Sequence, residues 1–367
     1  MRIAFFTETY YPTPDGVSHY LRDIRHALSG KGHDVRVYTL TGSGDQDVNV
    51  VSGFQFPFYR QYRIPRNPIP VGLLRRAMKF KPDIIHIHSP FFMGSVGLLA
   101  SRKLNVPIVA SFHTDFSSME ESVRMPFKKF FFNLSFKYSK YLYSQCNEIL
   151  CPSNHAANIA KSHGMVGARE VPLFVDTDRF VPGSSEKQKM ILFVGRLTVD
   201  KGVYSILELA SAMRGGEYRI LICGTGPEEE NMLDYIEQHS LQDIVQMEGY
   251  VKESRKIELM QVASFFIYPA LADTFGISVL EAMACGTPSI VVENFPLHTY
   301  ANGNSGLIKA DFSRIDEVVK LIDDLDRDRE NYARRSQSAR DFAANTFGID
   351  EHADSLISIY KSLLGTR

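Results

Sequence analysis

The sequence predicts an α/β protein of two domains, each with a doubly wound and largely parallel sheet. Three observations lead to this fold class. Short apolar runs with strand character alternate with runs of helical period along both halves of the chain. Glycine-bearing loops follow several of these strands, as they do in sheets that bind ligands beyond the carboxyl ends of their strands. The length of 367 residues also suits two domains of comparable size.

The first half of the chain repeats this alternation from its start. The expected strands span residues 2–6, 34–40, 50–59, 83–88, 107–111 and 148–151, with a short one near 170–171. The expected helices span 16–30, 93–104 and 153–163, and a further long helix begins at Pro126. Residues 60–71 are basic and rich in proline, so we expect a loop there.

The second half restarts the pattern after a linker. Residues 172–188 contain the run Pro-Gly-Ser-Ser from Pro182, a composition typical of an inter-domain linker. The expected strands then span 190–194, 218–223, 245–247, 265–268 and 289–292. The expected helices span 203–213, 227–238, 253–261 and 276–284. We expect the ligand to bind in the cleft between the domains, beyond the carboxyl ends of the strands.

The composition excludes several classes of protein. A net charge of −1 argues against a general nucleic-acid binder. Four cysteines, at positions 146, 151, 223 and 285, lack metal-ligand spacing and indicate small buried thiols in a reducing compartment. The chain starts with a short strand rather than a signal peptide, and no run of about eighteen apolar residues could span a membrane. We therefore expect a cytoplasmic protein.

The stretch from Asp273 to Pro288 organises the second half. It joins a strand to a helix that is expected to begin near Gly276, where free backbone N–H groups favour an anion. Asp273 in the loop and Glu281 in the helix could then accept from sugar hydroxyls on either side of a phosphate. The alternative is an ordinary amphipathic helix that Asp273 caps and on which Glu281 is solvated.

Three other strand ends in the second half carry candidate ligand contacts. Arg196 and Lys201 lie five residues apart after the first strand, so a guanidinium and an ammonium can converge on one diphosphate. Gly224 follows the next strand and allows close backbone approach. Tyr250 and Val251 follow a later strand and could hold a planar base. The alternatives are solvated basic residues and ordinary glycine turns.

The first half offers a loop and three histidines. Gly16 opens a helix after a strand and a loop, which is a phosphate-binding layout without the dinucleotide fingerprint. His113 follows the strand 107–111 and could donate to a sugar hydroxyl or meet a developing charge. His86 is expected in the core, and His88 at the end of the same strand could line an acceptor pocket.

The long helix from Pro126 combines aromatic and basic residues. At helical spacing, one stripe is expected to pack on the sheet: Phe127, Phe131, Leu134, Tyr138 and Tyr141. The other side mixes three aromatic residues with three lysines: Phe132, Phe136, Tyr143, Lys129, Lys137 and Lys140. Exposed aromatics among lysines suit an anionic membrane surface or a lipid headgroup. Packing under a neighbouring loop and contact with another protein are the alternatives.

These motifs in this order resemble the retaining glycosyltransferases of family 4 along nearly the whole chain. The resemblance implies the GT-B fold, two Rossmann-like domains with doubly wound parallel sheets that face each other across a cleft. It implies an acceptor-binding domain over 1–180, completed by a crossover helix at 347–367, and a nucleotide-sugar-binding domain over 181–346.

The resemblance also implies roles for single residues. Arg196 and Lys201 would hold the donor diphosphate, Glu281 the ribose and Asp273 the transferred sugar. Backbone N–H groups around Phe275, Gly276 and Ile277 would bind sugar and phosphate oxygens. Gly16 would approach the diphosphate and His113 the anomeric carbon, so the catalytic set would be His113, Arg196, Lys201 and Asp273. Two departures stand out: the family usually has Glu in place of Asp273, and residues 293–300 lack its usual paired glycines.

The activity that the resemblance implies is transfer of a hexose, such as glucose or mannose, from a UDP- or GDP-sugar without a metal or other cofactor. The expected acceptor is lipid-linked or lies at a membrane surface, with peripheral contact to its cytoplasmic face and no nucleic-acid partner. The leaving phosphate itself is a candidate base for the acceptor's proton. A soluble sugar or polyol acceptor, a non-catalytic sugar-nucleotide binder and a GT-B epimerase are the alternatives.

Overall fold

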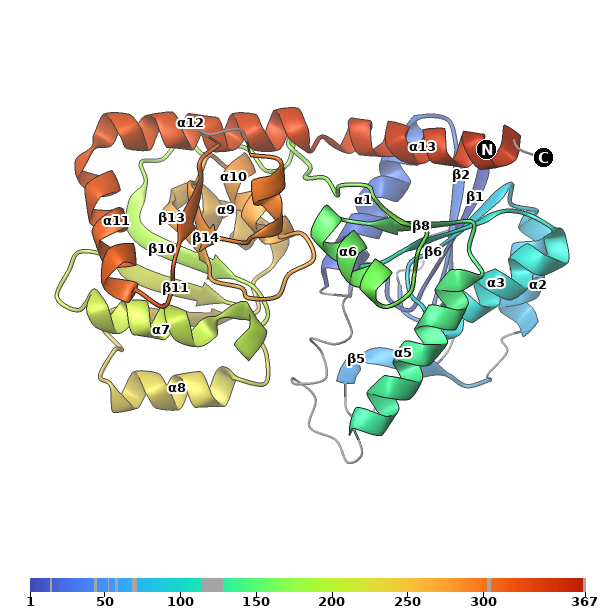
Figure 1. The fold of residues 1–367 in the computed structure, drawn as a ribbon, viewed down its shortest axis with the longest axis horizontal. Helices are drawn as coiled ribbons and strands as arrows, with labels where there is room; N and C mark the ends of the chain where they lie inside the picture. Colours follow the sequence, from blue (N-terminus) through green and yellow to red (C-terminus); the bar gives the residue numbers. More distant parts are fainter. Residues whose placement is uncertain are drawn as a thin grey trace. The chain divides into compact units, whose positions relative to one another are not determined.

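The computed structural model describes residues 1–13, 15–42, 45–51, 53–56, 59–67, 71–113, 128–301 and 305–365, without the side chains of residues 56, 59–62, 128, 131 and 132. Its internal contacts divide the chain into two units. The first combines Met1–Pro172 with Ile349–Arg367, and the second is Leu173–Gly348. Each unit has a parallel sheet between helices, so the predicted α/β class is confirmed (Figure 1).

The first unit is built on a parallel sheet with the strand order β3-β2-β1-β6-β7-β8-β9. Its strands are β1 (Arg2–Thr7), β2 (Asp34–Thr39), β3 (Val48–Val50), β6 (Ile84–Ile87), β7 (Ile108–Ser111), β8 (Glu148–Cys151) and β9 (Ala168–Glu170). Its helices are α1 (Gly16–Gly30), α2 (Val71–Phe80), α3 (Phe92–Leu104), α5 (Lys128–Ser144), α6 (Asn154–Ser162) and α13 (Ile349–Gly365). A separate antiparallel pair joins β4 (Gly53–Phe56) to β5 (Tyr59–Pro65).

The two faces of this sheet have different neighbours. The face that carries Phe6 and Ile87 packs under α3, where Gly97 allows close approach. The opposite face carries Phe5, His86 and His88, and its rings meet aromatic side chains of α1 and α13. The C-terminal helix α13 is therefore part of the first unit's core.

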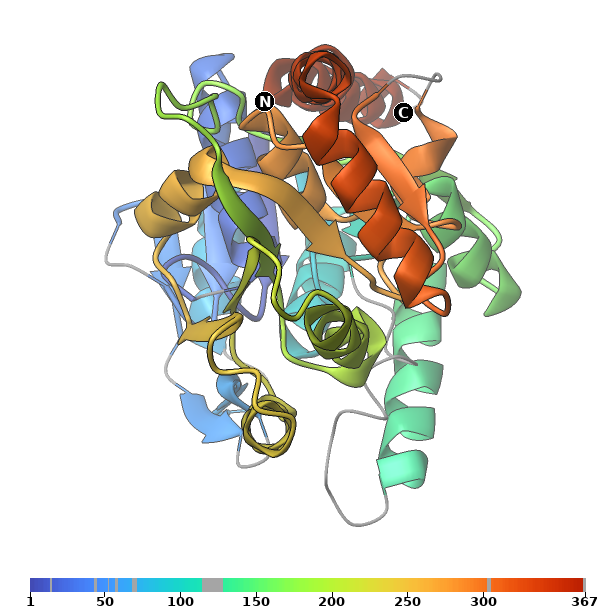
Figure 2. The same cartoon turned by 90° about the vertical axis from the view of Figure 1, so that its left-hand side faces the viewer.

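The second unit is built on a parallel sheet with the order β12-β11-β10-β13-β14-β15. Its strands are β10 (Gln188–Val194), β11 (Arg219–Cys223), β12 (Val245–Gly249), β13 (Ala263–Tyr268), β14 (Ser289–Val292) and β15 (Leu307–Ala310). Its helices are α7 (Val203–Ala212), α8 (Glu229–Gln238), α9 (Glu253–Val262), α10 (Ile277–Ala284), α11 (Ile315–Arg327) and α12 (Arg329–Thr346), with short 3₁₀ turns η1 (Val199–Lys201) and η2 (Pro296–Thr299). Helices α7, α8 and α11 pack together, and α10 packs against α9 and α12 (Figures 1 and 2).

The boundary between the units lies earlier than the sequence suggested. The first domain was expected to reach residue 180, but residues 173–180 belong to the second unit. Arg340 of α12 donates to the carbonyl oxygens of Phe180 and Thr177 at 2.7 and 3.0 Å. Arg179 donates to both carboxylate oxygens of Glu253 at 3.2 Å. Side chains distant in sequence hold this segment, which its composition could not reveal.

The prediction that residues 60–71 form a loop is wrong. Residues 60–71 contain most of β5, which pairs with β4 in the register Phe54 to Ile64 and Gln55 to Arg63. They also contain the first residue of α2, a helix that the sequence analysis missed. The proline Pro65 lies at the end of β5, where its missing N–H breaks no strand pairing. The prolines of this region therefore exclude neither a strand nor the start of a helix.

Candidate active site

The candidate ligand contacts of the second unit follow four neighbouring strands. Tyr250 and Val251 follow β12, Gly224 follows β11, Arg196 follows β10, and the loop of Asp273 follows β13. These strands are adjacent in the sheet and parallel. Their carboxyl ends therefore meet at one edge, which is where such sheets bind ligands.

Lys201 and Asp273 form the centre of a buried polar network at this edge. Lys201 Nζ donates to Asp273 Oδ2 at 2.8 Å and to the carbonyl oxygen of Ala272 at 2.7 Å. The Tyr268 hydroxyl donates to Asp273 Oδ2 at 2.9 Å, and the backbone N–H of Phe275 donates to Oδ1 at 2.9 Å. The sequence pointed to Lys201 and Asp273 separately, but it did not indicate that they bond to each other or to Tyr268.

The charges in this network are well compensated. Burial alone would lower the pKa of Lys201, but the neighbouring Tyr268 and Asp273 outweigh burial and raise it. Burial would raise the pKa of Asp273, and the charge of Lys201 together with three hydrogen bonds holds it below its ordinary value. Both groups are therefore charged at neutral pH, and the Lys201 ammonium lies at the strand ends beside the carboxylates of Asp273 and Asp200.

Close packing at two glycines shapes the same edge. Gly276 has a φ of +95° and precedes α10, so the helix begins where the sequence analysis expected it. A Cβ at Gly276 would collide with the ring of Phe295, and a Cβ at Gly224 would collide with the carbonyl oxygen of Gly195. Side chains are therefore excluded there, and the backbones of adjacent loops approach each other directly. Ile277, the first residue of α10, follows at once.

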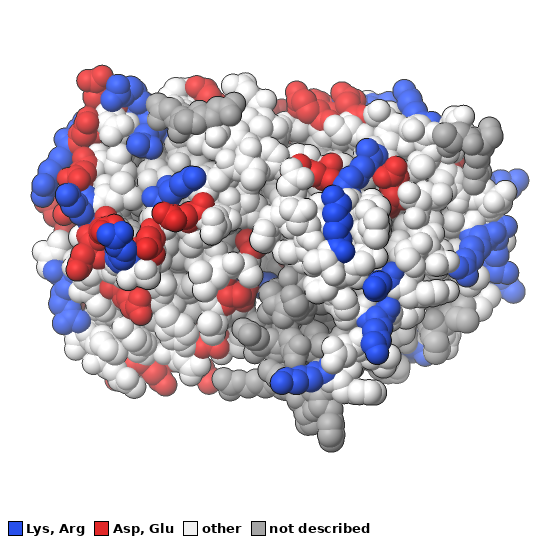
Figure 3. All heavy atoms as spheres, viewed as in Figure 1, with Lys and Arg blue, Asp and Glu red and all other residues white. Residues whose placement is uncertain are grey.

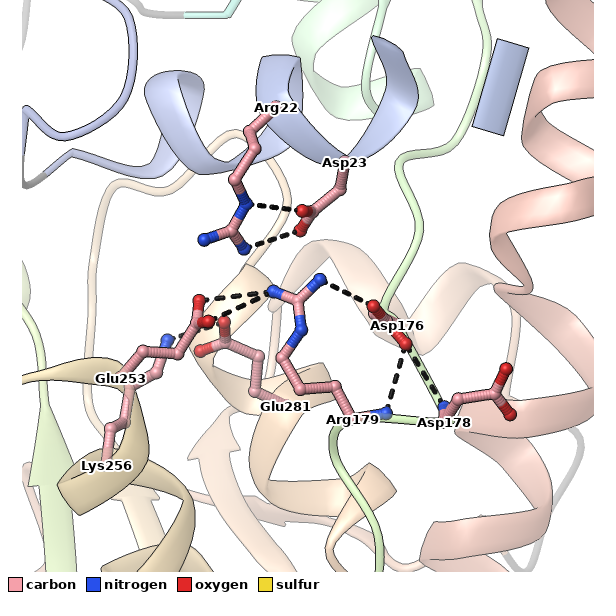
Figure 4. Close-up of polar contacts among 8 residues, drawn as sticks. All are labelled: Arg22, Asp23, Asp176, Asp178, Arg179, Glu253, Lys256 and Glu281. Atoms are coloured by element: carbon pink, nitrogen blue, oxygen red, sulfur yellow. Dashed lines mark hydrogen bonds and ion pairs between the residues drawn. The ribbon is translucent and has the colours of Figure 1, made fainter. Parts of the chain in front are cut away.

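Glu281 is anchored rather than solvated. Its side chain lies on α10 and is 12% exposed, and its Oε1 accepts from Lys256 Nζ of α9 at 2.6 Å. Figure 4 shows this pair beside the bidentate bond of Arg179 to Glu253. Arg179 also pairs with Asp176 at 2.5 Å. The alternative of a solvated Glu281 is therefore wrong, whereas its role toward sugar hydroxyls stays a prediction; its partner Lys256 carried no signal in the sequence.

Among the described residues, two oxygens of the loop after β10 lack hydrogen bonds, although one of them, Asp200 Oδ2, lies 3.7 Å from Lys201 Nζ. Thr198 Oγ1 and Asp200 Oδ2 are buried, and the part of the chain that the structure describes offers neither a hydrogen-bond partner. Arg196, between the strand and this turn, is exposed, as is Tyr250 at 56%. The strand edge thus combines an exposed guanidinium and an exposed aromatic ring with buried polar atoms that a ligand could satisfy.

In the first unit the histidines lie together at the strand ends. His88 Nδ1 and His113 Nε2 share a hydrogen bond at 3.1 Å. His86 is fully buried, with bonds at 2.7 Å to the Tyr360 hydroxyl and at 2.8 Å to Ser111 Oγ, so it is the expected core residue. His88 is 4% exposed. It meets His113, and the expectation that it lines an acceptor pocket stays a prediction.

Gly16 begins α1 as expected. Asp15 caps the helix, because its Oδ1 accepts from the N–H of Ser18 at 2.8 Å. A Cβ at Gly16 would meet no described atom within 4 Å. Packing within the described residues therefore does not require glycine here, and the predicted close approach to a diphosphate stays a prediction.

Helix α5 exposes the stripe that was expected to pack on the sheet. Leu134, Tyr138 and Tyr141 are 57%, 40% and 53% exposed, whereas Leu142 and Tyr143 are each 1% exposed. That prediction is wrong because α5 packs on α3 through its C-terminal end, where Leu142 touches the position of Gly94. The positions of Pro126 and Phe127 and the side chains of Phe131 and Phe132 lie outside the described part.

The basic residues of α5 are exposed as expected. Lys129, Lys137 and Lys140 all face solvent, and Figure 3 shows Lys and Arg atoms over the segment that α5 occupies in Figure 1. Phe130, next to Lys129, is 72% exposed. Phe136 is half-buried because its ring packs on His163, with centroids 4.3 Å apart. The lysines thus flank the exposed stripe.

No group of three or more His, Cys, Asp or Glu side chains among the described residues could hold a metal ion. Within the same residues, every helix is too short or too polar to serve as a transmembrane span.

Comparison with known proteins identifies the family. The model of glycosyl transferases group 1 matches residues 174–342, and that of glycosyltransferase family 4 matches residues 14–179. The two models match successive parts of the chain, which belongs to glycosyltransferase family 4. The resemblance that the motifs indicated is thereby confirmed.

Curated relatives include enzymes with two kinds of name. The GDP-mannose-dependent alpha-mannosyltransferase of Mycolicibacterium smegmatis is 27% identical over 396 residues, which cover 100% of this chain and 99% of the relative. The alpha-monoglucosyldiacylglycerol synthase of Streptococcus pneumoniae is 26% identical over 328 residues, which cover 80% of this chain and 71% of the relative.

Solved structures share the fold. Sucrose-phosphate synthase from Thermosynechococcus elongatus has a TM-score of 0.79 at 17% identity, covering 100% of both chains. Anabaena HepE in complex with UDP-glucose has a TM-score of 0.78 at 15% identity, covering 99% of this chain and all of the other. The predicted GT-B fold is thereby confirmed.

Proposed function

We propose that this glycosyltransferase moves a hexose from a nucleotide diphosphate sugar to an acceptor that is lipid-linked or lies at a membrane surface. The reaction retains the anomeric configuration and needs no metal ion. The observation that carries the proposal is the single sheet edge in the second unit, where Lys201, Arg196, Asp273 and the start of α10 meet. The names of the relatives, mannosyltransferases and a glucosyldiacylglycerol synthase, support both the donor class and the lipid acceptor.

The chemistry follows from the charges at this edge. As the bond between the anomeric carbon and the nucleoside diphosphate breaks, negative charge develops on the leaving phosphate. We assign Lys201 and Arg196 to stabilise that charge, with the N-terminus of α10 adding its dipole. Asp273 is already occupied by Lys201 and Tyr268. Its role is therefore to orient Lys201 and to bind sugar hydroxyls rather than to act as a nucleophile.

The remaining contacts complete the donor site. Glu281 accepts from the ribose hydroxyls, held in place by Lys256. Tyr250 and Val251 hold the base, and the backbone of Phe275, Gly276 and Ile277 binds phosphate and sugar oxygens. Gly224, whose loop packs directly on Gly195, offers its backbone to the diphosphate at the same edge. In the first unit, Gly16 approaches the diphosphate and His113 acts beside the anomeric carbon.

Substitution of Lys201 tests the proposal. Lys201→Ala is expected to lower kcat/KM by about 100- to 1,000-fold, because one preorganised charge is lost from the transition state. Lys320→Ala, which removes an exposed lysine of α11, should leave the rate unchanged. Thermal melting of both variants shows whether they fold. Full transfer by folded Lys201→Ala contradicts the proposal.

A donor screen decides the alternatives. UDP- and GDP-linked glucose and mannose are compared by the rise in melting temperature, since a ligand that binds only the folded state stabilises it by mass action. Transfer is then measured with diacylglycerol, with a polyol and with EDTA present, and NMR gives the anomer of the product. A donor that binds without transfer or hydrolysis supports a non-catalytic binder. Loss of activity in EDTA contradicts metal independence.

We further propose that α5 binds an anionic membrane surface peripherally. Phe130, Leu134, Tyr138 and Tyr141 are exposed on one side of the helix at positions i, i+4, i+8 and i+11, and lysines lie beside them. Aromatic rings suit the interfacial region and lysines suit anionic headgroups. This surface places the enzyme beside a lipid acceptor.

Flotation with vesicles tests this surface. Vesicles rich in phosphatidylglycerol should carry the protein, and phosphatidylcholine vesicles should carry much less. Replacement of Lys129, Lys137 and Lys140 by Gln should abolish flotation. The same charge change at Lys309, Lys320 and Arg327 of the second unit, all exposed, should not. Equal flotation of both triple variants contradicts the role of α5 and favours a soluble acceptor.

A further inference from the structure

Lys256 of α9 is the hydrogen-bond donor to the carboxylate that α10 carries. Its Nζ donates to Glu281 Oε1 at 2.6 Å, and the two side chains are 17% and 12% exposed. Within the part of the chain that the structure describes, this is the one hydrogen bond that the Glu281 carboxylate accepts. A carboxylate with so little access to water needs a cation beside it. Lys256 supplies that charge from a neighbouring helix.

The ammonium group of Lys256 also lies against an aromatic ring. Its Nζ is 5.0 Å from the ring centroid of Phe180, a residue that is 3% exposed. The face of an aromatic ring attracts a cation at this distance, and the attraction grows where water is excluded. Phe180 belongs to the segment that leads into the second unit before β10 begins. The ring therefore restricts where the ammonium group can lie.

Phe180 is itself fixed to the end of α10. Arg340 Nη1 donates to the carbonyl oxygen of Phe180 at 2.7 Å. The same nitrogen donates at 3.0 Å to the carbonyl oxygen of Ala284, the last residue of α10. One guanidinium thus joins the incoming segment to the helix that carries Glu281. The ring, the ammonium group and the carboxylate are therefore held together within the second unit.

The acid one turn before Lys256 on α9 has a partner of its own. Glu253 lies three positions before Lys256, a spacing at which opposite charges can pair on a helix surface. Both of its carboxylate oxygens accept from Arg179 at 3.2 Å. Figure 4 shows this pair beside the pair of Lys256 and Glu281. The two charged side chains of α9 thus meet different partners.

A carboxylate that is held in this way suits a ligand with two adjacent hydroxyl groups. A glutamate side chain has several rotatable bonds, and a flexible one loses that freedom when it binds a ligand. Glu281 has already lost it through Lys256. The ammonium group takes one of about four acceptor positions of the carboxylate, which leaves positions for two hydroxyl donors.

We propose that Lys256 is a positioning residue that determines donor specificity: by holding the Glu281 carboxylate toward both ribose hydroxyls, it makes the site select ribonucleotides over 2′-deoxyribonucleotides. This inference rests on the proposed function, in which Glu281 binds the ribose. A nucleotide without the 2′-hydroxyl loses a contact only while the carboxylate is in place. Loss of Lys256 should therefore remove the preference for ribose.

Binding of nucleoside diphosphates tests this proposal without requiring transfer. Isothermal titration calorimetry compares UDP with 2′-deoxy-UDP, and GDP with 2′-deoxy-GDP. The wild-type protein should bind one ribonucleotide about ten-fold more tightly than its deoxy form, as expected for one hydrogen bond to a charged group. Lys256→Met keeps an unbranched side chain without charge and should reduce this preference to less than about two-fold. Lys256→Gln gives the same comparison if the Met variant does not fold.

The outcomes separate this proposal from the proposed function. A preference that stays near ten-fold in the folded Lys256 variant overturns the present proposal alone. A wild-type protein that binds neither ribonucleotide overturns the proposed function and this inference with it. In transfer assays, Lys256→Met should raise KM for the donor while kcat changes little, because a contact made before and during the reaction is weakened. A fall in kcat at unchanged KM overturns the positioning role.

A double-mutant cycle shows whether Lys256 acts through Glu281. Glu281→Gln should itself lower the preference for ribose, and Lys256→Met should lower it no further in that background. A further loss of the same size in the double variant means that Lys256 contacts the nucleotide directly. That result also overturns the proposal.

Lys189→Met is the matched control. Lys189 pairs with Asp326 and lies 5.1 Å from the ring centroid of Tyr218, so its substitution removes the same kinds of contact. It lies near the start of β10, at the opposite end of this strand from the candidate site. It should lower the melting temperature and keep the preference for ribose. If Lys189→Met weakens the preference as strongly as Lys256→Met does, the effect is one of stability and the proposal fails.

Discussion

The two units use opposite kinds of buried polar chemistry at their strand ends. The second unit buries charges in pairs, Lys201 with Asp273 and Glu281 with Lys256. The first unit buries neutral rings, the histidines and tyrosines around His88. The strand ends of the second unit thus rely on ion pairs, whereas those around His88 rely on uncharged rings. This difference also makes different demands on pH and on substitution.

The largest expected effect is selective acid unfolding of the first unit. Burial lowers the pKa of four of its histidines: His86, His88, His113 and His352. Their stabilising contribution is present above the unfolded value near 6.5 and is lost as pH falls toward their folded values. At pH 5 each histidine lowers the free energy of unfolding by roughly 2 kcal/mol relative to neutral pH, which is on the order of 8 kcal/mol for the four.

Hydrogen exchange with mass spectrometry checks this expectation at pH 7 and pH 5. Peptides from β6, β7 and α13 should lose protection relative to peptides from β10, β11 and β13 in the same sample. The pKa of Asp273 is lowered, so the Lys201 pair persists at pH 5 and the second unit keeps its network. Loss of protection in the second unit first contradicts the comparison.

The next effect is the loss of one partner from the charged network. Asp273→Ala removes the carboxylate that accepts from Lys201 at 2.8 Å and leaves this buried ammonium with Asp200 at 3.7 Å, so we expect the free energy of unfolding to fall by about 3–5 kcal/mol. The double variant Lys201→Met with Asp273→Leu should recover most of this loss, because neither charge remains buried. Denaturant titration measures both.

An exposed ion pair serves as the control for this cycle. Glu317 pairs with Arg314, and their side chains are 58% and 61% exposed. Glu317→Ala should cost less than about 1 kcal/mol. A loss of similar size in Glu317→Ala and Asp273→Ala would mean that burial of the Lys201 pair has no energetic importance.

A smaller effect concerns Glu8, a buried carboxyl group that follows strand β1 directly. Burial raises the pKa of Glu8 to about 7, although its Oε1 accepts from the N–H of Met93 at 2.8 Å. A raised carboxyl pKa stabilises the fold at low pH. That contribution, roughly 3 kcal/mol, is fully present below pH 4.5 and is lost as pH rises to 7.

The free energy of unfolding of Glu8→Gln, relative to that of the wild-type protein, should therefore rise by roughly this amount between pH 4.5 and pH 7. Both proteins contain the same histidines, so the opposing contribution of the histidines cancels in the difference between the two free energies of unfolding. Glu237→Gln, on the exposed surface of α8, should show no such gain. A constant difference between Glu8→Gln and wild type across the range contradicts the raised pKa.

The fold was predictable where local signals agree. The bounds of α1 match the structure because Asp15 caps one end and glycines follow the other, and β8 and β14 match because they are short apolar runs. Helix α2 was missed because the prolines beside it dominated the pattern. The packing side of α5 was wrong because three-dimensional contact at Leu142, rather than periodicity, decides which side is buried.

The sequence predicts which loops carry the candidate site residues, but it does not predict the hydrogen bonds between them. Glycines, a lysine and a carboxylate that follow strands lie at one edge of the sheet, as expected, because parallel strands end on the same side. The bond from Lys201 to Asp273 spans 72 positions, and no local pattern carries such a pairing. The partners Lys256 and Tyr20 were missed for the same reason, since each lies on another element of its unit.

The return of the chain to the first unit has a consequence for synthesis. The His86 ring needs the hydroxyl of Tyr360, and Tyr20 needs His352, yet both partners lie on α13. During translation the whole second unit, Leu173–Gly348, leaves the ribosome before they do. The second unit can therefore fold first, while the earlier-made first unit waits with unpaired rings for its last helix.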